Sequence, residues 1–183
     1  MKIRLSDLKD RPCDRYYKYI KKHYGHGKFD PMEVFNVLKP DADHVSWLIC
    51  NTEICQTEEW LEYYKSLKPD TSDVRWLIFD TKICQTEEWF KYYKSLKPSA
   101  EDVNLLICNT EICQTEDWLE YYKSLKPDTS DVRWLIFDTK ICQTEEWFKY
   151  YKSLKPNASD VTWLKDNCEK FRQYEAKNEN KIK

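Results

Sequence analysis

The sequence has little glycine, no long apolar segment and no excess of charge of one sign. Only 2 of its 183 residues are glycine, so we expect few strained turns and helices joined by short connections. No apolar run approaches the ~18–20 residues that a membrane-spanning helix needs, and the N-terminal residues lack the apolar core of a signal peptide. These absences predict a cytoplasmic protein without a membrane segment.

The charge balance and the missing motifs narrow the classes of function. The formal net charge is −2 although 34% of the residues are charged, whereas nucleic-acid-binding proteins usually carry a basic excess. The chain has no Ser-His-Asp set, glycine-rich phosphate loop or metal-binding motif. Its paired acids, such as Glu58-Glu59, stand where they favour the start of a helix. We therefore expect no catalysis, no cofactor and no bound metal.

The cysteine pattern indicates buried thiols instead of disulfides. The chain has 8 cysteines but no CxxC pair, and its 3 histidines, all near the N-terminus, show no zinc-site spacing. Four cysteines recur once per repeat: Cys55, Cys84, Cys113 and Cys142. A disulfide needs Cα atoms within about 7 Å, so bonds between successive copies would be strained. We predict reduced cysteines that pack as small apolar residues and react little in the native state; a cysteine-ligated metal is the alternative.

The chain is built from a 29-residue repeat whose neighbouring copies differ and whose next-nearest copies are nearly identical. Each copy opens with Lys-Pro, at Lys39-Pro40, Lys68-Pro69, Lys97-Pro98, Lys126-Pro127 and Lys155-Pro156. The stretch from Lys68 to Pro98 recurs letter for letter from Lys126 to Pro156, so the larger unit has 58 residues. Periods of this length are typical of stacked repeats, in which a single copy cannot bury its own apolar face.

Each copy reads as two short helices, here called helix A and helix B. The residue after each Lys-Pro is a good helix N-cap: Asp41, Asp70, Ser99, Asp128 or Asn157. An apolar run such as Val74, Trp76 and Leu77 follows, which predicts a helix A of about ten residues. A threonine then caps helix B, whose apolar stripe includes Trp60 and Tyr64, and the next Lys-Pro ends it.

These patterns predict an all-α fold, an α/α solenoid of 29-residue helix hairpins with capping helices at both ends. Residues 1–38 are the N-terminal helical cap, with a helix over Asp14–Tyr24 and a second helix that starts at Asp30-Pro31. Residues 39–154 are four tandem repeats. Residues 155–183 are a half-repeat followed by a polar capping helix over Glu169–Lys183.

Neighbouring copies alternate in charge and in side-chain size. Two columns alternate in charge: Glu62, Lys91, Glu120, Lys149 and Glu53, Lys82, Glu111, Lys140. A third alternates in size: Cys50, Phe79, Cys108, Phe137. Equivalent positions of adjacent copies are neighbours in a stack, so the charged columns are expected to form ladders of ion pairs that hold the register.

Several strings resemble known helical repeats. The sequence Asp73-Val74-x-x-Leu77-Ile78, then Thr86-Glu87-Glu88-Trp89 and Leu96-Lys97-Pro98-Ser99, resembles pentatricopeptide and tetratricopeptide repeats, although those are about 34–35 residues long. The leader with Cys13…Tyr17, Asp30-Pro31-x-x-Val34 and Val45-x-Trp47-Leu48-Ile49 is similar to uncharacterised bacterial and phage proteins with Trp-rich repeats. That likeness implies a prokaryotic or viral origin and a phage or mobile-element protein that inhibits a host factor.

The expected function is non-catalytic recognition of another protein through the extended repeat surface. The candidate contacts are the variable helix-A column, Ser46, Arg75, Asn104 and Arg133, and the tyrosine strip, Tyr63, Tyr92, Tyr121 and Tyr150. The tyrosines could instead close the seam between repeats. An RNA-binding or other nucleic-acid-binding repeat protein is one alternative. A structural protein that sequesters a small molecule or assembles with itself is another.

Overall fold

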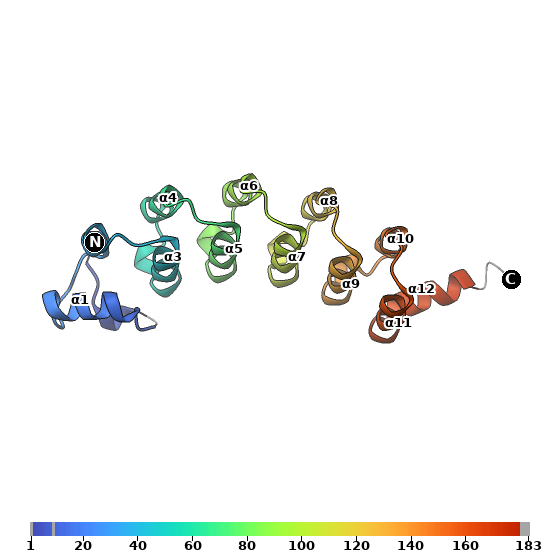
Figure 1. Cartoon of the computed structure of the whole chain (residues 1–183), viewed down its shortest axis with the longest axis horizontal. Coiled ribbons are helices and arrows are strands. Elements are labelled where there is room, and N and C mark those ends of the chain that lie inside the picture. Colours follow the sequence, from blue (N-terminus) through green and yellow to red (C-terminus); the bar gives the residue numbers. More distant parts are fainter. Residues whose placement is uncertain (1, 9, 180–183) are drawn as a thin grey trace. The chain divides into compact units, whose positions relative to one another are not determined.

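The computed structural model describes residues 2–8 and 10–179, and this part of the chain is all-α (Figure 1). It contains twelve α-helices and five short 3-10 helices, and an isolated antiparallel bridge between Ile3 and Phe29 is its one β interaction. No helix among the described residues is long and apolar enough to cross a membrane. The predicted fold class is confirmed. Residues 180–183 of the predicted capping helix lie outside the described part.

The chain forms two compact units, Met1–Lys97 and Pro98–Lys183, which meet at the third Lys-Pro. The first contains α1 (Asp14–Tyr24), α2 (Pro31–Leu38), α3 (Ala42–Asn51), α4 (Glu58–Ser66), α5 (Thr71–Asp80) and α6 (Glu87–Ser95). Helices A of its two repeats, α3 and α5, pack side by side, and each contacts its own helix B, α4 or α6. Helices α1 and α2 form the cap; α1 has the predicted bounds, and α2 begins at the predicted Asp30-Pro31.

The second unit repeats this arrangement and adds a half-repeat. It contains α7 (Ala100–Asn109), α8 (Glu116–Ser124), α9 (Thr129–Asp138), α10 (Glu145–Ser153), α11 (Ala158–Asn167) and α12 (Glu169–Glu179). Helices α7, α9 and α11 pack in succession, and α12 closes the unit against α10 and α11. The capping helix is not wholly polar, because Phe171 is fully buried and its ring packs 5.2 Å from that of Phe148.

The predicted caps start the helices A. In each of the five repeats the side chain of the N-cap residue accepts a hydrogen bond from the backbone amide three residues later. Reciprocal capping boxes form at Asp70 with Asp73 and at Ser99 with Asp102. At helix B, Thr86 and Thr144 accept from the amide three residues on, whereas Thr57 and Thr115 form no such bond.

The corner between helices A and B is a 3-10 helix, at Glu53–Cys55, Lys82–Cys84, Glu111–Cys113 and Lys140–Cys142. In the second repeat, the Thr81 hydroxyl donates to the Leu77 carbonyl (2.7 Å) and the Gln85 amide donates to the Ile78 carbonyl (3.0 Å). The cysteine at the end of each corner is fully buried, and none of the eight cysteines is in a disulfide bond. The prediction of buried, structural cysteines is confirmed for these four, whereas Cys13 is exposed.

The lysine of every Lys-Pro adopts a left-handed conformation, which the low glycine content does not predict. The φ angles of Lys39, Lys68, Lys97, Lys126 and Lys155 are 47°, 55°, 57°, 56° and 57°. A left-handed residue is the usual way to end a helix and reverse the chain, and glycine normally occupies it. The expectation of few strained turns is therefore wrong, because a side chain at positive φ costs about 1–2 kcal/mol.

The core lies between the two helices of each repeat. Val74, Leu77 and Ile78 of α5 are fully buried, and helix B contributes a buried tryptophan and tyrosine, such as Trp60 and Tyr64. Trp76 does not share this face, since it is 55% exposed. The tryptophans of helix A therefore lie on a surface that the core does not use.

Candidate functional site in the grooves between helices A

Three members of the variable helix-A column, Ser46, Asn104 and Arg133, lie in seams between neighbouring helices A instead of on an open surface. Arg75 and Asn104 are only 8% and 7% exposed, and Ser46 is half-buried with its hydroxyl donating to the Asp43 carbonyl. The Asn104 amide donates to the backbone carbonyl of Asp131 in the next repeat (3.0 Å). Members of this column therefore contact the next repeat, so they are not a freely exposed strip for contacts with a partner.

The seam between α9 and α11 is closed by an arginine. Arg133 forms an ion pair with Asp160 across the seam. Its guanidinium carbon lies 4.8 Å from the centroid of the Trp163 ring and 5.6 Å from that of Trp134. The two indole rings lie 5.0 Å apart, and the Phe137 ring lies 5.2 Å from Trp163. Arginine, carboxylate and aromatic rings therefore fill this seam together.

The seam between α3 and α5 is open and forms a groove, here called groove 1. It has a volume of about 290 Å³ and is lined by Asp43, Ser46, Trp47, Cys50, Asn51, Asp73, Trp76, Leu77 and Asp80. Three of these residues are acids and none is basic. The two tryptophans come from neighbouring helices A, so that the groove offers carboxylates and indole faces from both sides.

A second groove of the same construction, groove 2, lies between α7 and α9. It has a volume of about 690 Å³ and is lined by Glu101, Asn104, Leu105, Cys108, Asn109, Ser130, Asp131, Trp134 and Asp138. Eight of these nine positions follow a residue of groove 1 by 58, the length of the larger repeat. Groove 2 again has three acids and no base.

Both grooves keep part of the closed seam but lack its arginine, and in groove 2 Leu105 stands where the closed seam has Trp134. Counting along the 29-residue repeat, Ser46 and Asn104 hold the place of Arg133, and Asp73 and Asp131 hold the place of Asp160. The bulky Phe137 is likewise replaced, by Cys50 or Cys108. The alternation in side-chain size thus has a structural consequence: small residues leave an opening where the large ones close the seam.

Three carboxyls of the grooves, those of Asp73, Asp131 and Asp138, lie where ionisation is unfavourable. Burial, followed by the hydrogen bond and charge of Asp43, raises the pKa of Asp73 to about 6. Burial and then the charges of Asp128 and Glu101 raise the pKa of Asp131. Burial also raises the pKa of Asp138. Burial is the main cause of these shifts, and the neighbouring acids add to it at Asp73 and Asp131. A positive ligand in either groove would favour the ionised carboxylates.

The tyrosine strip lies on helices B, and Tyr92 and Tyr150 line the seam with the preceding helix B of their own unit. All four tyrosines are half-buried, and each packs edge-on against a tryptophan of its own helix, as in Tyr92 on Trp89 (5.5 Å). The Lys65 ammonium of the preceding repeat lies 4.9 Å from the Trp89 ring and 5.6 Å from the Tyr92 ring. Lys123 covers Trp147 and Tyr150 in the same way. This packing favours the seam role of the strip.

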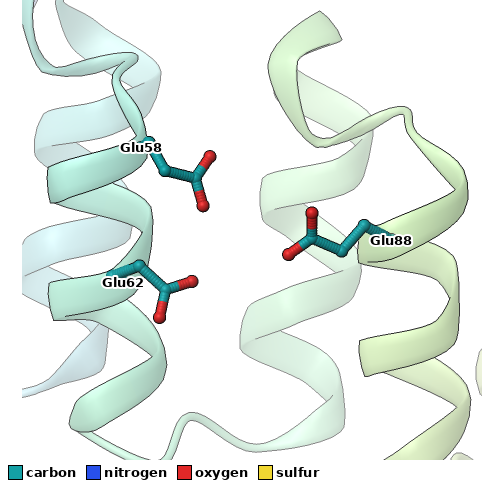
Figure 2. A group of neighbouring side chains, drawn as sticks. All are labelled: Glu58, Glu62 and Glu88. Atoms are coloured by element: carbon teal, nitrogen blue, oxygen red, sulfur yellow. The ribbon is translucent and has the colours of Figure 1, made fainter.

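The same lysines hold clusters of three glutamates together. Figure 2 shows Glu58 and Glu62 of α4 pointing towards Glu88 of α6, with carboxylate oxygens within 4.8 Å of one another. The Lys65 ammonium bonds to Glu62 (2.8 Å) and Glu88 (3.1 Å). Glu116, Glu120 and Glu146 form the equivalent cluster around Lys123. A lysine already supplies the positive charge that these acids would offer to a metal.

The predicted charge ladders are wrong within each unit. Glu62 and Glu120 pair with the lysine three residues later in their own helices. Lys91 and Lys149 pair with Glu87 and Glu145 four residues earlier. No ion pair between described residues joins Glu53 to Lys82 or Glu111 to Lys140. Among the described residues, the helices B are joined to the next helix B or to α12 by Lys65–Glu88, Lys123–Glu146 and Lys152–Glu175, which share a spacing of 23 residues. Arg133–Asp160 joins two helices A.

The sequence analysis missed the exposed helix-A tryptophans, although a signal for them was present. Trp47, Trp76, Leu105, Trp134 and Trp163 form a column with the 29-residue spacing. Trp76, Leu105 and Trp134 are 55%, 40% and 43% exposed. A column of large apolar residues that stays exposed in successive repeats marks an interaction surface more strongly than the polar column beside it.

Comparison with models of protein families, with curated proteins and with solved structures found no match to this chain.

Proposed function

We propose that this protein is a non-catalytic recognition module whose helix-A grooves bind an arginine-bearing segment of a partner protein. One observation carries the proposal: grooves 1 and 2 keep an aspartate and a tryptophan at the places of Asp160 and Trp163 in the α9–α11 seam but lack its arginine. A guanidinium from a partner would supply the missing group, pairing with Asp73 or Asp131 and stacking on Trp76 or Trp134. Arginine suits such a site because it is planar, weakly hydrated and able to bond two carboxylate oxygens.

The charge of the grooves favours a protein partner over the alternatives. Each groove is lined by three acids and no base, and this arrangement repels the phosphates of RNA or DNA. Two grooves with equivalent acids and a shared tryptophan position also suit an extended chain with several side chains better than one small molecule. A small cationic ligand and self-association remain outcomes of the test.

The proposal is tested with fluorescent peptides and with variants that fill the grooves from inside. An arginine-rich peptide should bind, measured by fluorescence anisotropy, whereas a glutamate-rich peptide and single-stranded RNA should not. The double variant Ser46→Arg and Asn104→Arg places in each groove the side chain that closes the α9–α11 seam. It should weaken peptide binding at least tenfold, which corresponds to about 1.4 kcal/mol, without loss of stability.

The matched control is Thr162→Arg, which changes the same column at an exposed position outside both grooves. This variant should bind the peptide like the parent protein. A second set, Trp76→Ala with Trp134→Ala, should weaken binding while the core stays intact. Tight RNA binding, or an unchanged peptide affinity in the filled-groove variant, would contradict the proposal. Equal affinity for free arginine and for the peptide would assign the grooves to a small molecule.

A further inference from the structure

The N-terminal cap contains a thiol, an imidazole and a carboxylate in a line. Cys13 Sγ lies 3.6 Å from Nε2 of His44, which comes 31 residues later in the chain. On the other side of the ring, His44 Nδ1 bonds to Oδ1 of Asp41. A carboxylate only accepts hydrogen bonds, so Asp41 places the ring proton on Nδ1 and turns the Nε2 lone pair towards the thiol.

The fold positions each member of this line. Asp41 is the N-cap of α3 and also accepts from the His44 amide (3.1 Å), so that its carboxylate is fixed by two bonds. Partial burial raises the pKa of Asp41, but the bonds from the His44 ring and amide outweigh it and hold the pKa below its ordinary value. Cys13 is the N-cap of the 11-residue helix α1 and is exposed. The amides of the first turn of α1, which lack partners within the helix, therefore follow directly after the thiol.

A cavity of about 430 Å³ opens beside the thiol and the imidazole. Cys13 and His44 line it together with apolar side chains, among them Phe35, Trp47 and Leu48. Tyr16 also lines it, and although this residue is only 3% exposed, its hydroxyl has no hydrogen-bond partner. The Tyr16 ring packs 4.8 Å from that of His44. The lining also includes Arg11 and Asp43, so the cavity offers a mostly apolar wall and an unpartnered Tyr16 hydroxyl next to the thiol and the imidazole.

We propose that Cys13 is a nucleophile that accepts an acyl group from an ester whose acyl chain is short and apolar. In this step His44 Nε2 takes the thiol proton while the sulfur attacks the carbonyl carbon. A C–S bond forms, the ester C–O bond breaks, and the departing oxygen takes the proton from His44, which leaves a thioester on Cys13. Asp41 is a positioning residue that orients the imidazole. The first-turn amides of α1 are the groups available to the carbonyl oxygen as negative charge develops on it.

The proposal sets Cys13 apart from the other cysteines of the chain. Cys55, Cys84 and Cys142 are fully buried, and burial raises the pKa of each thiol to about 12. Cys50, which is half-buried, is the matched internal comparison. The sequence predicts that every cysteine reacts little in the native state. For Cys13 we now expect a reactive thiol instead.

The experiment uses the full chain and p-nitrophenyl butyrate as the probe. We expect one butyryl group, located on Cys13 by peptide mass spectrometry, and release of p-nitrophenolate that matches it in the first turnover. Cys13→Ala should abolish both signals. His44→Ala should slow acylation by about 100-fold or more, the usual contribution of a general base, and added imidazole should restore part of the rate. Asp41→Asn keeps the N-cap acceptor and should slow acylation without changing the helical circular dichroism signal.

Three results would overturn the proposal: no acylation in the parent protein, butyryl groups spread over Cys50 and other cysteines as readily as on Cys13, or His44→Ala acylated at the parent rate. Loss of the reaction through misfolding of a variant is separated from loss of chemistry by the imidazole rescue, because an unfolded protein would not regain selective labelling of Cys13. The peptide binding of the grooves is an independent readout, so either proposal can fail while the other stands.

Discussion

Replacing Lys123 by methionine removes the ammonium that joins two neighbouring helices B while it keeps the aliphatic stem. In the structure this ammonium bonds to Glu120 (2.8 Å) and Glu146 (2.9 Å), and it lies 4.9 Å from the Trp147 ring and 5.8 Å from the Tyr150 ring. The side chain is 18% exposed. The substitution therefore breaks contacts within α8 and between α8 and α10 at once.

The expected loss follows from these contacts. A partly exposed ion pair contributes about 0.2–1 kcal/mol, and an ammonium on an aromatic face contributes about 0.5–1 kcal/mol at an exposed site. Removing the charge also leaves three glutamates whose carboxylate oxygens lie within 4.8 Å of one another. Lys123→Met should therefore lower the free energy of unfolding by about 1–3 kcal/mol. Since part of this loss is repulsion, adding Glu146→Gln to the variant should recover some of it.

Urea unfolding at low and high salt measures these effects. Lys123→Met should lose stability at low salt and regain part of it at high salt, because ions screen the uncompensated glutamates. Glu120→Lys should also destabilise, but adding Lys149→Glu should not rescue it, since Lys149 pairs with Glu145 of its own helix. A neutral Lys123→Met at low salt, or full rescue of Glu120→Lys by Lys149→Glu, would refute this network and restore the charge ladder.

Three further predictions concern the turns, the thiols and the groove acids. Lys126→Gly should raise the free energy of unfolding by about 0.5–1 kcal/mol, because glycine avoids the cost of positive φ and only part of that gain is lost to chain entropy. A lower free energy of unfolding, measured in urea, would contradict this. Thiol titration should count eight thiols in the denatured protein, whereas iodoacetamide should label Cys13 first in the native protein; first labelling at Cys84 would argue against its burial. Burial and the hydrogen bond that protonated Asp73 donates to Asp43 raise the pKa of Asp73, so its ionisation opposes folding. Stability should therefore fall as pH rises from about 4 to about 6, and Asp73→Asn should flatten that slope. Protonation of Asp73 should conversely weaken peptide binding to groove 1 as pH falls below about 6, and an affinity independent of pH would argue against a role for this carboxyl.

The repeat made much of the fold predictable. Lys-Pro followed by a capping residue marks each helix A, and the period places every equivalent residue, so the helices follow from local rules. The left-handed lysines were not predictable in the same way. Their conformation is imposed by the reversal from one helix into the next, and composition alone argued for few strained turns.

The candidate sites depend on the distances between residues of neighbouring repeats, which an alignment of the repeats does not give. Two residues at equivalent positions need not touch: Glu120 contacts Lys123 of its own helix and not Lys149 of the next repeat. The thiol site has no sequence signal, because Cys13 and His44 lie 31 residues apart and belong to different helices. The sequence shows that Ser46 stands at the position equivalent to Arg133, which is a hint of the grooves. The packing of the helices is needed to bring the acids and rings of each groove together.

Fluorine NMR of protein labelled with 5-fluorotryptophan can show directly whether the helix-A grooves bind a basic protein segment. The 8 tryptophans divide into two groups, which single Trp→Phe variants would assign. Trp47, Trp76, Trp134 and Trp163 lie on helices A, and Trp60, Trp89, Trp118 and Trp147 lie buried on helices B. An arginine-rich peptide should shift the resonances of Trp47, Trp76 and Trp134 and leave the four helix-B resonances in place. Shifts confined to the helix-B group, or no shift at saturating peptide, would contradict recognition through the grooves.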